Sequence, residues 1–226
     1  MKLLLFFFFS SLEYVSIFLL MLVLFRQKIR IHLGKIAFLC FFLGLVSHFI
    51  RYTLQLNEFA IIVQIITMVA SLRFLWNIQW FYSIVMAVIS YCAFLAINLL
   101  TFILMNTFGL IQLDQLQEAD GTGLAYMGYV LQIVTVCMCA IVIGIIRYLN
   151  RGWAFIPDGE KEVEYRKKEN QQLLIASFIA FVSFGSILFI GNMWGNKTFT
   201  ISFFVLACIL ATLFYLATKK DEAEHD

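Results

Sequence analysis

Long, unbroken apolar segments are the feature that most limits what this chain can fold into. The first runs from Phe6 to Phe25 and carries a single charged side chain, Glu13, near its middle. About 20 consecutive apolar residues are what an α-helix needs to cross the hydrocarbon of a bilayer. Of the 226 residues, 62% are hydrophobic and 13% are charged, whereas soluble domains carry about 25% charge. The sequence therefore predicts an integral membrane protein.

The same length criterion predicts an all-α fold, a polytopic bundle of about seven transmembrane helices. The bundle forms a single domain over residues 1–226. Its predicted helices cover residues 3–25, 36–55, 59–76, 81–108, 124–148, 173–192 and 199–218. Residues 149–172 form the predicted cytoplasmic loop, and residues 219–226 form a cytoplasmic tail.

The placement of the basic residues predicts the orientation of this bundle. Lys and Arg accumulate on the cytoplasmic side of membrane proteins. With the amino terminus outside, thirteen of the sixteen basic residues fall in inner segments, and the exceptions are Lys2, Arg51 and Lys197. The longest outer loop, residues 110–123, is acidic. We therefore expect the amino terminus outside and the carboxyl terminus in the cytoplasm.

Glu13 is the first candidate functional residue, because an ionisable group inside a membrane segment is costly and commonly functional. It precedes Phe25 by 12 positions, or roughly 18 Å at the helical rise of 1.5 Å per residue. His48 is predicted at a similar depth on the second helix, with Arg51 one turn further out. One hypothesis makes Glu13, His48 and Arg51 an intramembrane coupling group. The other makes Glu13 a packing feature that is protonated, or hydrogen-bonded to Ser or to Gln on a neighbouring helix, such as Gln64.

A second candidate site follows the fifth predicted helix. Trp153 and Phe155 stand close to Arg147 and Arg151 in the sequence. Aromatic rings and basic groups are both favoured at the headgroup level of a membrane. These four residues are predicted to form an interfacial anchor on an otherwise solvated loop.

The residue types needed for several activities are missing from the sequence. The last predicted helix holds no lysine for a retinal Schiff base, and HExxH, GxGxxG, P-loop and GxSxG motifs do not occur. We expect no enzymatic activity, no cofactor, no metal site and no nucleic-acid partner.

Three stretches of the chain resemble the membrane sensor region of AgrC-like, quorum-sensing bacterial histidine kinases. They are LEYVSIFLLMLVLFR at 12–26, IQWFYSIVMAVISYCAF at 78–94 and RYLNRGWAFIP at 147–157. The resemblance covers about a fifth of the chain. Kinases of this group continue into a phosphoacceptor helix and an ATP-binding domain, whereas this sequence ends at KKDEAEHD. The chain is therefore expected to be a stand-alone relative of the sensor region or the membrane part of a longer protein.

The resemblance implies a signal-input protein in the plasma membrane of a bacterium. Its expected partners are the lipid bilayer, an extracellular peptide ligand, a kinase or another membrane protein, and a second copy of the chain. The competing class is a small transporter or a membrane subunit of a transport complex. Transporters are commonly built from internal repeats and broken helices; no repeat is visible, and the one proline, Pro157, falls in a predicted loop.

Overall fold

The computed structural model describes residues 2–27, 29–54, 60–111, 125–156, 167–194 and 196–225. Every regular element in these ranges is helical, which confirms the predicted all-α fold class for them. Most of the predicted acidic outer loop and residues 157–166 of the predicted cytoplasmic loop lie outside the described ranges.

The helices follow one another along the chain with short connections between most of them. Their bounds are α1 Lys2–Leu24, α2 Ile29–His48, α3 Ala60–Trp76, α4 Trp80–Thr107, α6 Ala125–Tyr148, α7 Lys168–Trp194 and α8 Asn196–His225, with a π-helical segment, η1 Phe49–Thr53, after α2.

Three of these helices extend well beyond the apolar segments from which they were predicted. α2 begins at Ile29 instead of Ile36, and α7 begins at Lys168 inside the predicted loop. α8 continues to His225, so residues 219–225 of the predicted tail are helical. The length of an apolar segment indicates only the part of a helix that is shielded from water. Lys and Glu are also good helix formers, so a helix can continue beyond that segment into residues that contact water.

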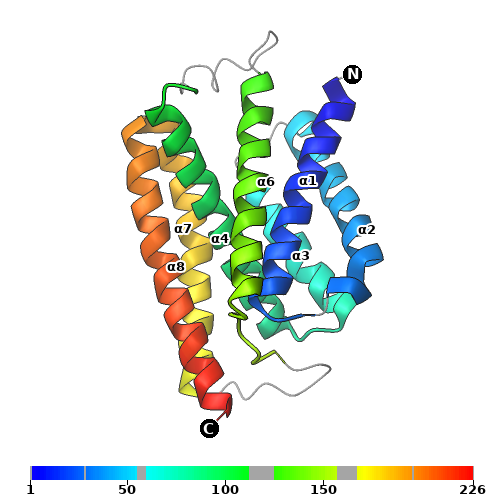
Figure 1. Ribbon diagram of the computed structural model, residues 1–226, viewed down its shortest axis with the longest axis vertical. Helices are drawn as coiled ribbons and strands as arrows, with labels where there is room; N and C mark the ends of the chain where they lie inside the picture. Colours follow the sequence, from blue (N-terminus) through cyan, green and yellow to red (C-terminus); the bar gives the residue numbers. More distant parts are fainter. Residues whose placement is uncertain are drawn as a thin grey trace.

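α4 is the central helix of the bundle, and the helices on either side of it lie roughly along the long axis (Figure 1). It contacts α1, α3, α6, α7 and α8. Between Phe81 and Phe94 nearly every residue of α4 is buried. A helix that is apolar on all sides is buried in protein or in lipid, and this stretch of α4 is buried by its neighbouring helices. The two chain ends lie at opposite ends of the bundle (Figure 1).

Five helices of the described chain are long and apolar enough to cross a membrane. They include Leu5–Leu24, Leu33–Arg51, Trp80–Thr107, Met127–Tyr148 and Ile201–Glu224. Ile61–Trp76 is also apolar but shorter. These helices indicate a membrane protein.

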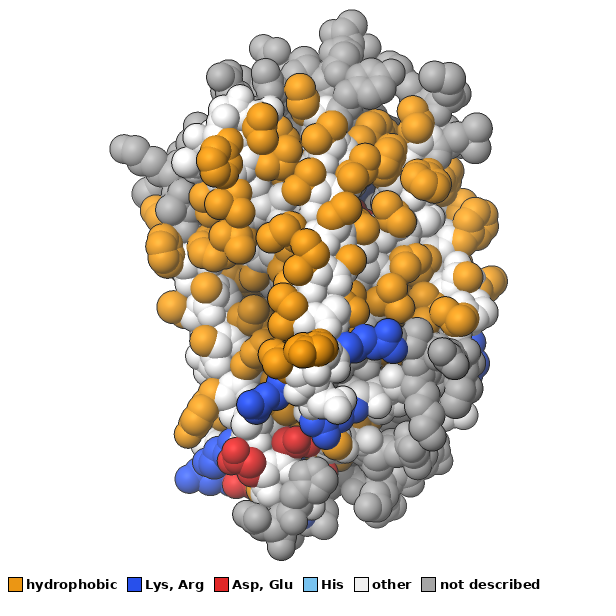
Figure 2. Space-filling model, viewed as in Figure 1, with side chains coloured by type: hydrophobic (Ala, Val, Ile, Leu, Met, Phe, Trp, Pro, Cys, Tyr) orange, Lys and Arg blue, Asp and Glu red, His pale blue; other side chains and the backbone are white. Residues whose placement is uncertain are grey.

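The surface of the bundle agrees with a membrane environment. Apolar side chains cover most of the face seen in Figure 2, while Lys and Arg gather near the end at which the carboxyl terminus lies. Large apolar residues such as Ile141, Phe178 and Phe204 are more than half exposed. Soluble monomers rarely expose apolar patches of this extent. We call the end with the Lys and Arg side chains the basic end of the bundle.

Candidate functional site

Polar side chains from five helices meet inside the apolar bundle. We call them the interior polar cluster, whose members are Glu13 and Tyr14 of α1, Ser47 of α2, Gln64 of α3, Tyr91 of α4 and Gln132 of α6. Tyr14, Ser47, Gln64 and Tyr91 are buried. Burying a polar group costs free energy unless the group is hydrogen-bonded, so the contacts of the cluster decide its stability.

A chain of hydrogen bonds links three helices of the cluster. The Tyr91 hydroxyl donates to Gln64 Oε1 at 3.0 Å, and Gln64 Nε2 donates to Ser47 Oγ at 3.2 Å. Gln64 is therefore the link between α4 and α2. Tyr14 of α1 is buried next to Glu13 in the sequence.

Glu13 connects α1 with α6. Its Oε2 accepts a hydrogen bond from Gln132 Nε2 at 3.2 Å, whereas Arg51 is exposed in η1. A glutamine on a neighbouring helix is the kind of partner that the packing hypothesis names. The glutamine that bonds Glu13 is Gln132 of α6, however, and Gln64 bonds Ser47 and Tyr91 instead.

His48 lies nearer the start of α1 than the sequence predicts. Its ring packs against Phe6 and Phe7, with centroid separations of 5.7 and 5.3 Å, six to seven positions before Glu13. The reason is the early start of α2 at Ile29, which carries the end of that helix past the level of Glu13. The structure thus groups His48 with the aromatic start of α1. A coupling role for Glu13, His48 and Arg51 stays a prediction.

Three buried polar atoms near the middle of the described bundle have no hydrogen-bond partner among the described residues: Gln132 Oε1, Thr135 Oγ1 and Ser90 Oγ. Gln132 and Thr135 are three positions apart and so share a face of α6. Buried polar atoms without a partner are uncommon in native structures. Gln132 Oε1 and Thr135 Oγ1 of α6 and Ser90 Oγ of α4 therefore retain unused hydrogen-bonding capacity among the described residues.

Sequence reasoning missed Gln132, although a signal for it exists. Gln132 interrupts the apolar segment of α6 in the same way that Glu13 interrupts that of α1. What the sequence does not state is that the two helices are neighbours, and the contact between α1 and α6 supplies that fact.

Trp153 joins α1 to α8 at the basic end. Its backbone N–H donates to the Leu24 carbonyl at 2.8 Å, and its indole Nε1 donates to Thr218 Oγ1 at 3.1 Å. The ring contacts Phe25 and Phe214, with centroids 5.4 and 4.9 Å away. The side chain is 7% exposed.

Gly152 makes this close approach of the chain to α1 feasible. Its φ of 141° lies in a region that side chains disfavour. A Cβ at this position would lie 2.9 Å from the Leu24 carbonyl oxygen. Only glycine therefore fits without a shift of the backbone.

A buried lysine completes the basic end. Lys220, only 2% exposed, lies over the rings of Phe81, Tyr82 and Phe155, with Nζ 5.0 to 5.2 Å from their centroids. Its ammonium donates to Asn170 Oδ1 and pairs with Glu224 at 3.2 Å. We call these rings the aromatic cage; a cation over aromatic faces is attracted by their quadrupoles. The cage brings together α4, α8 and the segment that follows α6.

The four residues of the predicted interfacial anchor separate into two environments. Trp153 and Phe155 are buried, and their rings pack against aromatic side chains of the bundle. Arg147 and Arg151 are exposed and line a pocket of about 640 Å³. An anchoring role in the headgroup region stays a prediction for all four.

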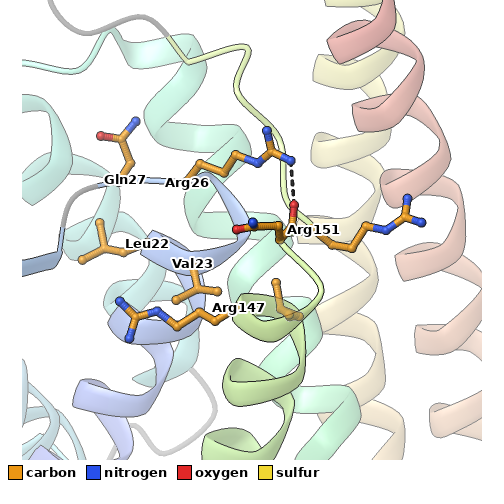
Figure 3. Close-up of a pocket in the computed structure, with 8 residues that line it drawn as sticks. Leu22, Val23, Arg26, Gln27, Arg147 and Arg151 are labelled. Atoms are coloured by element: carbon orange, nitrogen blue, oxygen red, sulfur yellow. Dashed lines mark hydrogen bonds between the residues drawn. The ribbon is translucent and has the colours of Figure 1, made fainter.

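That pocket, which we call the arginine pocket, lies at the basic ends of α1 and α6 (Figure 3). Its polar lining consists of Arg26, Gln27, Arg147, Asn150 and Arg151. Arg26 Nη2 donates to the Asn150 carbonyl at 2.8 Å. The side chains of Arg147 and Arg151 extend in opposite directions from the end of α6 (Figure 3).

No match to this chain was found among models of known protein families, curated proteins or solved structures. The resemblance to AgrC-like sensor regions stays a prediction, and so does the absence of enzymatic activity. Within the described ranges, no group of three or more His, Cys, Asp or Glu side chains is placed to hold a metal ion.

Proposed function

We propose that the protein is a multi-pass signal-input protein of the bacterial plasma membrane, in which an extracellular ligand changes helix packing and a separate partner reads the change. The observation that carries this proposal is the interior polar cluster. It makes five helices share one set of directional contacts inside an otherwise apolar bundle. Apolar packing tolerates small shifts, whereas hydrogen bonds specify one arrangement over another.

The proposal includes seven membrane-spanning helices with the amino terminus outside. The gathering of basic side chains at one end of the molecule supports this orientation (Figure 2). In this orientation, the basic end faces the cytoplasm and the first residues of α1 face the outside.

α1 is the proposed connection between the two ends. It carries Glu13 in the interior polar cluster, and its last residues contact Trp153, which in turn bonds Thr218 of α8. A displacement of α1 would therefore act on α8. The last turn of α8 is exposed at Glu222 and Glu224, where a cytoplasmic partner has access.

Co-purification from native membranes tests the proposal. The tagged full chain should recover a histidine kinase or another phosphorelay protein. Glu13→Gln, in which the amide still accepts the bond from Gln132, should recover the same partner but alter its phosphorylation state. A matched variant, Gln171→Glu, changes one amide to a carboxylate at an exposed site of α7 and should alter neither. Recovery of transport components alone would overturn the proposal.

A small transporter is the second candidate, and the unpartnered oxygens of Gln132 and Thr135 on α6 favour it. Gln132 Oε1 and Thr135 Oγ1 have capacity to bind a solute at the level of the carboxylate. A transporter should accumulate solute in vesicles that contain only this chain, and Thr135→Val should abolish the accumulation. A sensor should show no accumulation under the same conditions.

A further inference from the structure

The arginine pocket adjoins an apolar groove along the bundle. α6 and α8 flank this groove, and α4 and α1 also line it. Ile146 lines both the groove and the pocket. Along α1, Leu20 and Leu24 face the groove, while Leu22 and Val23 line the pocket. The arginine pocket and the apolar groove therefore adjoin at Ile146.

Small side chains create the groove. Ala93 and Ala96 of α4 and Ala207 and Ala211 of α8 line it, and the groove has a volume of about 400 Å³. This volume lies within the range of about 300 to 1,000 Å³ for small-ligand sites. A packed helix, by contrast, is about 10 to 12 Å across. The dimensions suit a flexible hydrocarbon chain better than a helix from another protein.

The charge of the arginine pocket indicates which headgroup a hydrocarbon chain in the groove would carry. Its described lining holds three arginines and no carboxylate. In the part of the chain that the structure describes, neither Arg147 nor Arg151 forms an ion pair with an acidic side chain. Guanidinium groups bind phosphate oxygens in bidentate geometry. Among the described residues, this positive charge is therefore available for an anion.

The position of the pocket suits a lipid headgroup. Basic side chains lie directly beside the apolar surface in Figure 2, the level at which phosphates of a bilayer are found. Basic pockets between membrane helices on the cytoplasmic side are typical sites for anionic lipids. We propose that the arginine pocket and the apolar groove together bind one anionic phospholipid of the phosphatidylglycerol type, with its phosphate in the arginine pocket and one acyl chain between α6 and α8.

The headgroup half of the site is tested with the purified full chain in detergent. Binding of fluorescent phosphatidylglycerol should exceed binding of phosphatidylcholine, whose ammonium cancels the phosphate charge. Each arginine is expected to contribute about fivefold to the preference. The double variant Arg147→Gln, Arg151→Gln should lose about 25-fold in phosphatidylglycerol binding. Lys219 is an exposed basic residue of α8 at the basic end of the bundle. Lys219→Gln is therefore the matched control and should retain phosphatidylglycerol binding.

The acyl half is tested by filling the groove. Ala211→Phe places a ring in the groove from its open side and should weaken phosphatidylglycerol binding at least as much as the loss of one arginine. Ala140→Phe makes the same change at an exposed site of α6 outside the groove and should bind as the wild type does. Thermal unfolding of each variant checks that it is folded.

Three outcomes would overturn the proposal. Equal binding of phosphatidylglycerol and phosphatidylcholine would remove the charge argument. Full competition by inorganic phosphate, with no effect of Ala211→Phe, would identify a site for free phosphate instead. A change of oligomeric state in Ala211→Phe without loss of lipid binding would identify the groove as an interface between two copies of the chain.

Discussion

At the scale of single residues, Glu13 and Gln132 form the hydrogen bond that links α1 and α6 in the interior polar cluster. Glu13 Oε2 accepts one hydrogen bond from Gln132 Nε2, and the amide oxygen of Gln132, Oε1, has no partner among the described residues. Hydrogen bonds between membrane helices contribute about 0.6 kcal/mol on average and up to about 1.7 kcal/mol. The pair is thus a modest stabiliser and a specific one.

A double-mutant cycle measures this pair. Glu13→Gln should change thermal stability by less than about 1 kcal/mol, because the amide still accepts a hydrogen bond from Gln132. Glu13→Ala should cost about 1 to 3 kcal/mol, since it leaves the buried Gln132 amide without a partner. When Glu13→Ala is combined with Gln132→Ala, the coupling energy between the two side chains should lie between about 0.6 and 1.7 kcal/mol. Additive effects of the two alanine substitutions would show that the side chains do not interact.

Gly152 is the second residue whose effect can be predicted from geometry. Gly152→Ala should destabilise the protein by more than about 1 kcal/mol, because its φ of 141° is unfavourable for alanine and the new Cβ meets the Leu24 carbonyl at 2.9 Å. Gly144→Ala is the matched control: this glycine lies inside α6, and nothing lies within 4 Å of a Cβ built there. The control should be neutral or stabilise by up to about 1 kcal/mol, since alanine favours a helix over glycine. Equal melting temperatures for both variants would contradict the proposed close approach.

At the scale of elements, α1 and α6 end in the same way and side by side. Each ends in a Schellman motif. Arg26 and Asn150 adopt a left-handed φ of 50° and donate to Val23 and Arg147, respectively. The motif satisfies the last carbonyls of a helix and turns the chain sharply. The turn after α6 directs Trp153 back onto α1, which is how two helix ends become one packed unit.

The extension of α8 beyond its apolar segment depends on Lys220. Lys220→Ala should loosen residues 219–225, because it removes the cation from the aromatic cage, the bond to Asn170 and the pair with Glu224. Hydrogen exchange should become faster in this segment while the rest of α8 keeps its protection. Lys219→Ala, the exposed neighbour, should leave exchange unchanged. If both variants exchange alike, the cage does not hold the end of α8.

At the scale of the whole molecule, α4 is the element that makes one bundle out of two groups of helices. α1 and α3 contact it on one side and α7 and α8 on the other. Its buried stretch around Val85, Met86 and Ile89 belongs to the same hydrophobic core as Phe18 of α1 and Leu213 of α8. Movement in either group is therefore opposed by packing against the same helix.

The orientation of the bundle is tested by reporter fusions. Fusions at Gln115 and Lys220 should report opposite sides of the membrane, because the bias of basic residues places the first outside and the second in the cytoplasm. A fusion at Asn150 should agree with Lys220. Gln115 lies outside the described residues, so this expectation rests on the sequence. Reports of one side from both Gln115 and Lys220 would contradict the topology and the depth assigned to Glu13.

The sequence by itself determined the class of the protein and the approximate course of most helices. Apolar length and helix formation are local properties, and the bounds of α1, α3, α4 and α6 follow closely from them. The polar starts of α2 and α7 and the end of α8 could not be found in this way, because hydropathy does not record where helical hydrogen bonding stops.

Only the tertiary structure decided which side chains meet. Glu13 is conspicuous in the sequence, yet its hydrogen-bond partner lies 119 positions away, on α6. Lys220 looks like the start of a solvated tail, and its burial becomes visible only when α4, the segment after α6, and α7 surround it. The physical reason is that lateral packing of apolar helices follows from side-chain shape and a few polar contacts across the bundle, and these depend on neighbours that no single stretch of sequence contains.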